Sequence, residues 1–91
     1  MNLKKKQLYF DLGNQLPKIH QHLNFENHCY WRIALDNTLN AKWKDVVSSP
    51  AYKNISEEQL NHVIHLLESY KEDEQLLLEH NKISLTYRGK K

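Results

Sequence analysis

Three polar residues spaced four apart form the pattern in this sequence that could do chemistry. They are His28, Arg32 and Asp36, and residues four apart lie on one face of an α-helix. A guanidinium binds carboxylate or phosphate groups through paired hydrogen bonds, a carboxylate can orient that guanidinium, and a histidine exchanges protons near neutral pH. These three residues, here called the polar stripe, predict a site for a small anionic or polar ligand.

Aromatic residues in and beside the same segment are expected to form the walls of this site, because their flat rings stack well. A purely structural interpretation is also open. In it Arg32 and Asp36 pair along the helix, which contributes only about 0.3 kcal/mol if exposed, or the polar stripe is a half-buried polar network in which Arg32 needs partners from other elements. The predicted ligand-binding residues are His28, Tyr30, Trp31, Arg32, Asp36 and Trp43.

The helix that carries the polar stripe is expected to lie at the centre of the fold. Residues 25–43 contain neither Gly nor Pro, and apolar side chains cover roughly 240° of the helical circumference. A helix that is apolar on most sides needs neighbours on two sides. The pattern allows this helix to extend to about residue 47.

The other segments predict helices that pack around this central one. Leucine and isoleucine recur on one helical face over residues 8–23, where Gly13 and Pro17 predict a bend between two short helices. Pro50 predicts the start of a short helical turn. Ser56 and Gln59 fit a capping box that begins a last helix, expected to end near residue 80.

We therefore predict an all-α fold, a compact bundle of three main helices plus a short helix, with the central helix at about residues 25–47. Residues 1–83 are expected to form a single helical domain. Residues 84–91 are expected to form a basic C-terminal tail that is extended or disordered.

The composition narrows the class of protein. Of the 91 residues, 40% are hydrophobic and 26% are charged, as in globular domains and unlike disordered chains. A single cysteine excludes an internal disulfide and a cysteine-based zinc site. Cys29 falls on the apolar arc of its helix, where a buried thiol packs and does not react. Neither a signal-peptide pattern nor a membrane-spanning stretch is present, so a cytoplasmic protein is expected.

Six histidines raise the question of a metal site. The weak candidates are His62, His65 and Glu68, which share the polar face of the last helix, and a His pair three apart with a carboxylate can bind zinc or iron. The patterns H-E-x-x-H and E-x-x-H do not occur. A solvated helix face accounts for these residues, so neither a metal nor another cofactor is predicted.

Charge is distributed unevenly along the chain, with lysine-rich and arginine-rich ends on either side of an acidic segment at residues 57–79. Basic ends can bind nucleic acid, and such binding weakens steeply as salt rises. The net charge is only +2, so the simpler interpretation is that the ends fold back on the acidic helix.

A resemblance adds to this picture. The run H-C-Y-W-R-I-A-L-D-N over residues 28–37, with Ala41-Lys42-Trp43 and the P-A-Y-K of residues 50–53, resembles a small bacterial family of uncharacterised function. Some similar chains carry an acetyltransferase-like label. This sequence has no glycine-rich loop for a pyrophosphate and too little chain for a mixed sheet around acetyl-CoA. The resemblance therefore draws attention to the polar stripe without implying an activity.

The predicted function is a small binding or regulatory module that recognises a protein partner or a small anionic ligand through the polar stripe. Binding is favoured over catalysis. The first alternative is a small enzyme in which His28 is the acid–base, Arg32 binds an anionic substrate and Asp36 assists. The second is a nucleic-acid-binding protein that uses both basic ends. A homodimer is a further expectation, because a helical chain of this length often covers its apolar faces with a second copy.

Overall fold

The computed structural model describes residues 3–89, which form helices and no strand. This confirms the predicted all-α class. The elements are α1 (Leu3–Ile19), the 3₁₀ helix η1 (Gln21–Leu23), α2 (Asn27–Leu39), α3 (Trp43–Val46), α4 (Ala51–Asn54), α5 (Glu57–Glu72) and α6 (Glu74–Tyr87).

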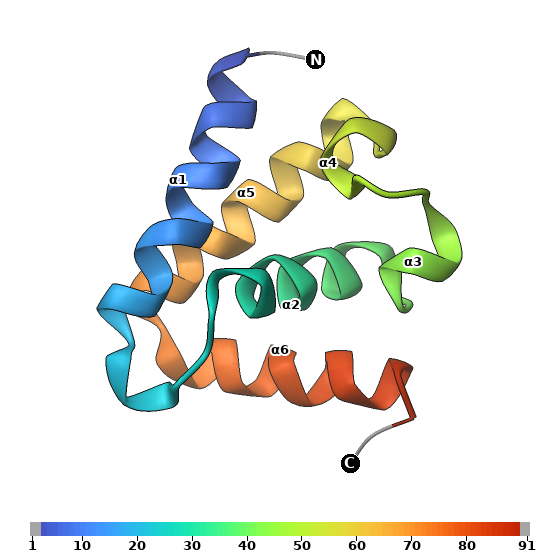
Figure 1. Cartoon of the computed structure of the whole chain (residues 1–91). Helices are drawn as coiled ribbons and strands as arrows, with labels where there is room; N and C mark the ends of the chain where they lie inside the picture. The colour runs from blue at the N-terminus through green and yellow to red at the C-terminus, as the bar shows by residue number, and fades with distance from the viewer. Residues whose placement is uncertain (1–2, 90–91) are drawn as a thin grey trace.

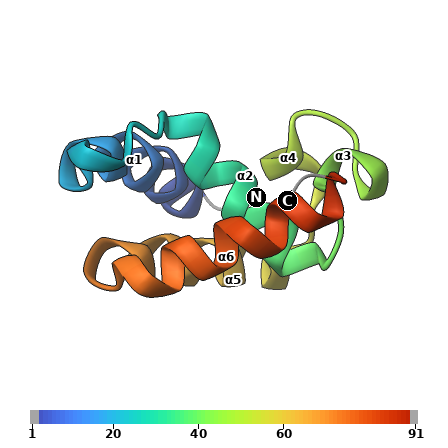
Figure 2. The ribbon, with the colours of Figure 1, turned by 90° about the horizontal axis from the view of Figure 1, so that it is seen from below.

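Helix α2 lies at the centre, as its apolar circumference predicted. It packs against α1, α5, α6 and α3 (Figure 1). Seen from below, α6 runs across the molecule, with α1 at one end and α3 and α4 at the other (Figure 2). The Cα atoms extend 33 × 28 × 17 Å, and since a helix with its side chains is about 10 Å across, the fold is roughly two helices thick.

A single apolar core joins the four long helices, and α2 contributes to it on several sides. Its members are the buried side chains Tyr9, Leu12, Leu16, Tyr30, Ile33, Ala34, Leu35, Ala51, Leu60, Val63, Ile64, Leu66, Leu67, Tyr70 and Leu77.

The central helix is shorter than expected. It ends at Leu39 and not near residue 47, because Asn40 adopts a left-handed backbone conformation with φ 55°. The Asn40 N–H bonds the Asp36 carbonyl, as is typical of a residue that closes a helix. The chain then turns, and Trp43 begins the separate helix α3.

The predicted bend in the first element is wrong, since α1 is continuous from Leu3 to Ile19. Pro17 lies in the last turn, where its missing N–H removes a single bond, to the carbonyl of Gly13, near the end of the helix. Gly13 is buried because the indole of Trp31 lies directly against its backbone, in the space that a Cβ atom would occupy. The absence of a side chain at Gly13 therefore allows α1 and α2 to approach each other closely.

Gly13→Ala is expected to lower the free energy of unfolding by about 2 kcal/mol, because the new methyl group meets the Trp31 ring and the two helices must move apart. This cost should outweigh the gain in helix propensity, which is about 1 kcal/mol. Urea denaturation measures the change. In a Trp31→Leu background the same alanine should be neutral or stabilising, and an equal cost in both backgrounds would contradict the explanation.

The last helix is divided in two, so the fold has four long helices where three were expected. The capping box at Ser56 and Gln59 is confirmed, with both of its hydrogen bonds formed. At Asp73 the backbone leaves the helical region, and the Asp73 side chain accepts a hydrogen bond from the Leu76 N–H to begin α6. The chain reverses direction there (Figure 1). Tyr70 Oη and His80 Nδ1, 2.7 Å apart, then join α5 to α6.

The extended tail predicted from residue 84 is also wrong. Helix α6 continues to Tyr87, and Ser84 is fully buried. Residues 90 and 91 of that expected tail lie outside the described residues. Within residues 3–89, none of the helices has the length and apolar character needed to cross a membrane.

Candidate functional site

The polar stripe runs from solvent to core along α2. The side chain of His28 is 68% exposed, Arg32 is half-buried, and Asp36 is fully buried. Three residues on one helical face therefore meet three different environments. Arg32 and His28 line one groove, and Asp36 lies outside its lining.

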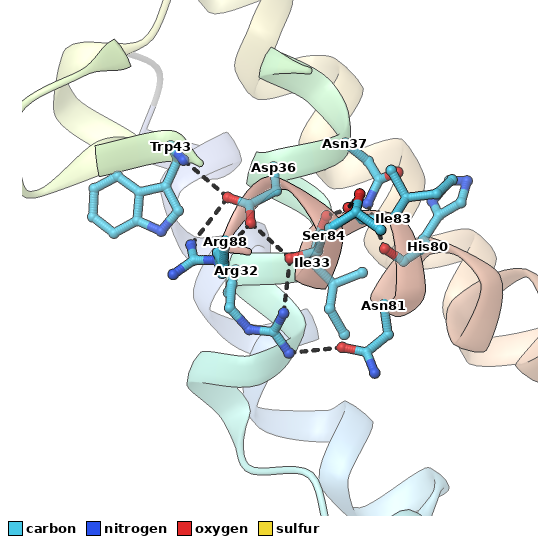
Figure 3. Close-up of polar contacts among 11 residues, drawn as sticks. Arg32, Ile33, Asp36, Asn37, Trp43, His80, Asn81, Ile83, Ser84 and Arg88 are labelled. Atoms are coloured by element: carbon cyan, nitrogen blue, oxygen red, sulfur yellow. Dashed lines mark hydrogen bonds and ion pairs between the residues drawn. The ribbon is translucent and has the colours of Figure 1, made fainter. Parts of the chain in front are cut away.

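Asp36 is the centre of a buried polar network between α2 and α6 (Figure 3). Its Oδ1 accepts hydrogen bonds from the Trp43 N–H at 2.9 Å and from Arg88 Nη2 at 3.1 Å. Its Oδ2 accepts from Ser84 Oγ at 2.6 Å and from Arg88 Nε at 2.8 Å. Four donors and one opposite charge thus satisfy the buried carboxylate, as burial of a charge requires.

Arg32 does not pair with Asp36, so the intrahelical ion pair considered from the sequence is absent from the described residues. Its Nη1 donates to Ser84 Oγ and its Nη2 to Asn81 Oδ1, both at 2.7 Å. The Ser84 hydroxyl therefore accepts from Arg32 and donates to Asp36 (Figure 3). The hydroxyl group thus links Arg32 and Asp36 indirectly, as a bridge between them.

A second polar contact holds the same two helices together. The side-chain amide of Asn37 donates to the carbonyl oxygens of Ile33 at 2.8 Å and His80 at 2.9 Å. The contact with His80 crosses from α2 to α6 (Figure 3). Side chains of α2 thus bond α6 near residues 80, 81, 84 and 88.

A groove of about 210 Å³ opens beside this network, between α1, α2 and the segment from α3 to α4. Four of the six residues predicted to bind a ligand line it: His28, Trp31, Arg32 and Trp43. The other described residues that line it are Tyr9, Phe10, Leu35, Ser49, Pro50, Ala51 and Tyr52.

The aromatic wall of the groove is held by ring contacts and one hydrogen bond. The Trp31 indole stacks on the Tyr9 ring, with centroids 5.4 Å apart and planes 10° apart, and its Nε1 donates to the Tyr9 carbonyl at 3.0 Å. Phe10 meets the rings of both Trp31 and Tyr52 edge to face. Such arrangements are the favourable ones for aromatic rings, so this wall is formed without a ligand.

The groove carries little charge. Arg32 is the only permanently charged residue among the described residues that line it. His28 Nδ1 lies 3.3 Å from the exposed Glu26 carboxylate. Nearby lysines lie against the rings of the wall, since Lys6 Nζ is 5.4 Å from the centroid of Tyr52 and Lys44 Nζ is 5.7 Å from that of Trp43. The rim therefore carries both signs of charge, from Lys6 and Lys44 and from the Glu26 carboxylate.

Two of the six predicted ligand-binding residues are placed elsewhere. Asp36 lies beneath the groove in the network just described, and Tyr30 is fully buried in the core, where its hydroxyl has no hydrogen-bond partner among the described residues. Burial, with smaller contributions from Cys29 and Glu74, raises the pKa of Tyr30 to about 12. The prediction that Tyr30 is a wall of the site is wrong, because it points 100° away from Trp31 on the helix and meets the core.

The other candidate groups are also located. His62, His65 and Glu68 are exposed on α5, and residues 3–89 contain no cluster of three His, Cys, Asp or Glu side chains arranged for a metal. Cys29 is half-buried and not fully buried as expected.

Some basic side chains near the two ends of the chain bond acidic groups within the fold. Lys5 Nζ lies 2.9 Å from the Glu57 carboxylate, and Arg88 bonds Asp36. The Lys5–Glu57 contact is of the kind expected for ends that fold back on the acidic helix, whereas Arg88 bonds a carboxylate of α2 instead.

Ser84 and Arg88 are two of the site residues that the sequence pattern did not predict, because residues from 84 onward were expected to form a tail. A signal was present. Leu77, Asn81, Ser84 and Arg88 follow one another at spacings of four, three and four, and no Gly or Pro intervenes before Gly89. This spacing continues one helical face.

Comparison with models of protein families, with curated proteins and with solved structures finds no match to this chain.

Proposed function

We propose that this chain is a small binding module whose groove holds an anionic ligand with an apolar body. The observation that carries the proposal is the composition of the groove, in which aromatic walls surround a single permanent charge, the Arg32 guanidinium. Pockets that bind small molecules have this character, with mostly apolar walls and a few polar groups that fix orientation.

The state of Arg32 supports a role in binding. Ser84 and Asn81 are the acceptors that its guanidinium reaches within residues 3–89, and they use two of its five N–H donors. The remaining donors leave room for a carboxylate or phosphate. The two bonds to α6 also limit the motion of the side chain, so little freedom is lost when a ligand binds.

The size of the groove favours a small ligand over a protein partner. A stable protein–protein interface involves about 20 to 30 residues on each side, whereas eleven of the described residues line this groove. A protein that docked here would need additional contacts across α1 or α4. A small ligand needs only the groove.

Binding at this site would also provide a route to regulation. Arg32 bonds both Ser84 and Asn81 of α6, so a ligand that draws the guanidinium toward the groove weakens or lengthens contacts that hold α6. A ligand that binds one conformation of a protein more tightly than another shifts the population toward the conformation that it prefers. The end of α6 is the element that such a shift would affect.

The two tryptophans of the chain give a direct test, because both Trp31 and Trp43 line the groove. Heteronuclear NMR resolves their two indole N–H signals. We expect small apolar anions, both aliphatic (octanoate) and aromatic (phenylacetate, phenyl phosphate), to shift these signals in a saturable manner. Neutral analogues of the same shape should bind at least tenfold more weakly, as is typical when a charged hydrogen-bond partner is lost. Equal binding of neutral and anionic analogues, or shifts confined to other residues, would contradict the proposal.

A further inference from the structure

We infer that the preferred ligand of this groove is a monocarboxylate carried on a single aromatic ring, of about the size of phenylacetate. This inference rests on the proposed function and names the chemical class of its ligand. Three features of the groove carry it: its volume, its charge and the arrangement of its rings.

The volume of the groove matches an apolar body of one ring. A cavity of about 150 Å³ holds one benzene molecule, and the groove has about 210 Å³. The difference accommodates a short substituent that carries the acid group. The groove is smaller than the roughly 300 to 1,000 Å³ that is usual for pockets of drug-sized ligands, so the part of a larger ligand, such as a nucleotide, beyond about one ring would extend into solvent.

The charge of the lining matches one negative charge. Arg32 supplies a single permanent positive charge, and no Asp or Glu lies among the described lining residues. Asp36 beneath the groove is already paired with Arg88. A carboxylate therefore finds one guanidinium with donors to spare, while the nearby Glu26 carboxylate lies outside the lining, 3.3 Å from His28 Nδ1. A second negative charge would find no further permanent positive charge among the described lining residues, and a partly desolvated charge without a partner is costly.

The rings of the wall favour an aromatic body over an aliphatic one. Tyr9, Phe10, Trp31 and Tyr52 already form a set of stacked, edge-to-face and tilted contacts with centroids 4.9 to 5.7 Å apart. A ligand ring placed against this wall continues the same set of contacts, and each added aromatic pair contributes beyond the area that it buries. A saturated ring fills the same volume and loses that contribution.

The test compares four probes by NMR titration of the Trp31 and Trp43 indole signals on the full chain. Phenylacetate is expected to bind at least tenfold more tightly than phenylacetamide, which keeps the shape and removes the charge. It should bind about fivefold more tightly than cyclohexylacetate, which keeps the charge and removes the aromatic ring. Phenyl phosphate is expected to bind no more tightly than phenylacetate.

Matched variants separate a specific contact from a general effect of positive charge. Arg32→Met should weaken phenylacetate binding at least tenfold. Lys44→Met removes one positive charge from the same rim, where its ammonium lies against Trp43 outside the lining, and should change binding less than twofold because an exposed charge is screened by salt. Arg32→Lys retains the positive charge and loses the paired N–H donors, so its affinity for phenylacetate should lie between those of Arg32→Met and Lys44→Met. The melting temperature of each variant shows whether it is folded.

Each other outcome overturns the inference in a distinguishable way. If octanoate or phenyl phosphate binds and phenylacetate does not, the groove binds an apolar anion of another class, and only the proposed function stands. If a peptide ending in a phenylalanine carboxylate binds tenfold more tightly than phenylacetate, the occupant is the end of a protein chain. If Arg32→Met and Lys44→Met weaken binding equally, recognition by Arg32 is wrong. If none of the anions shifts the indole signals, the proposed function fails as well.

Discussion

Asp36→Asn is expected to lower the free energy of unfolding by roughly 3 kcal/mol and the melting temperature by about 15 °C. Four donors converge on this carboxylate, from the Trp43 backbone, from Ser84 and twice from Arg88. An amide has one acceptor oxygen and places an N–H₂ group against donors at the other position. It also leaves the Arg88 guanidinium, whose side chain is only 17% exposed, without its counter-charge. Thermal unfolding followed by far-UV circular dichroism measures the loss.

Asp45→Asn is the matched control for this substitution. Asp45 is exposed in the first turn of α3, where a carboxylate contributes only through its favourable position near the helix N-terminus. Its replacement should change stability by no more than about 0.5 kcal/mol. If the two variants show equally small decreases in melting temperature relative to the unmodified protein, then the network around Asp36 is not a major source of stability.

Features of the fold that depend on neighbouring residues were predictable from the sequence. The apolar circumference of residues 29–35 indicated a central helix, and Ile33, Ala34 and Leu35 are buried in α2. The capping box at Ser56 needs only the spacing of two polar side chains, and both of its bonds form. In each of these cases the physical cause lies within one or two turns of helix.

The partner of Asp36 could not be predicted in this way. Helical periodicity shows which residues share a face and does not show what lies opposite that face. Arg32 is the nearest cation in sequence, whereas Arg88 is 52 residues away and becomes a neighbour only after the chain turns at Asp73. Local spacing therefore favoured the wrong arginine.

The break at Asp73 explains several of the differences together. The residues Lys71-Glu72-Asp73-Glu74 have the composition of an exposed helical turn, so the pattern predicted a continuous helix. Tertiary contacts override that local preference. Among them, His20 Nε2 lies 2.6 Å from the Tyr70 carbonyl, and the His22 imidazole lies 2.6 Å from the Glu74 carboxylate. The reversal then places α6 beside α2 and the expected tail against Asp36.

The candidate site was partly predictable for the same reason. His28, Arg32 and Trp31 belong to α2, so their relation to one another follows from helical geometry. The opposite wall of the groove comes from α1 and from residues 49–52, and the approach of α1 depends on Gly13 beneath the Trp31 ring. Which of the adjacent residues Tyr30 and Trp31 faces the groove is decided by that packing.

The two arginines around Ser84 are expected to respond very differently to the same substitution. Arg88→Met should lower the free energy of unfolding by about 3 kcal/mol, because it removes the one opposite charge that pairs with the fully buried Asp36 within residues 3–89 and leaves each oxygen of Asp36 with one donor. Arg32→Met should lower it by only about 1 kcal/mol. It removes bonds to two neutral groups, Ser84 and Asn81, from a half-buried side chain, and Asp36 keeps its ion pair.

Thermal unfolding of both single variants and of the double variant measures this contrast and the coupling between the two arginines. If the arginines act separately, the two losses should add to within about 0.5 kcal/mol, since Arg32 reaches Asp36 only through the Ser84 hydroxyl. A loss for Arg32→Met as large as that for Arg88→Met would mean that Ser84 transmits the charge and that Arg32 is primarily a structural residue. A small loss means that the guanidinium is held in the groove at little benefit to stability, as is usual for residues kept for binding.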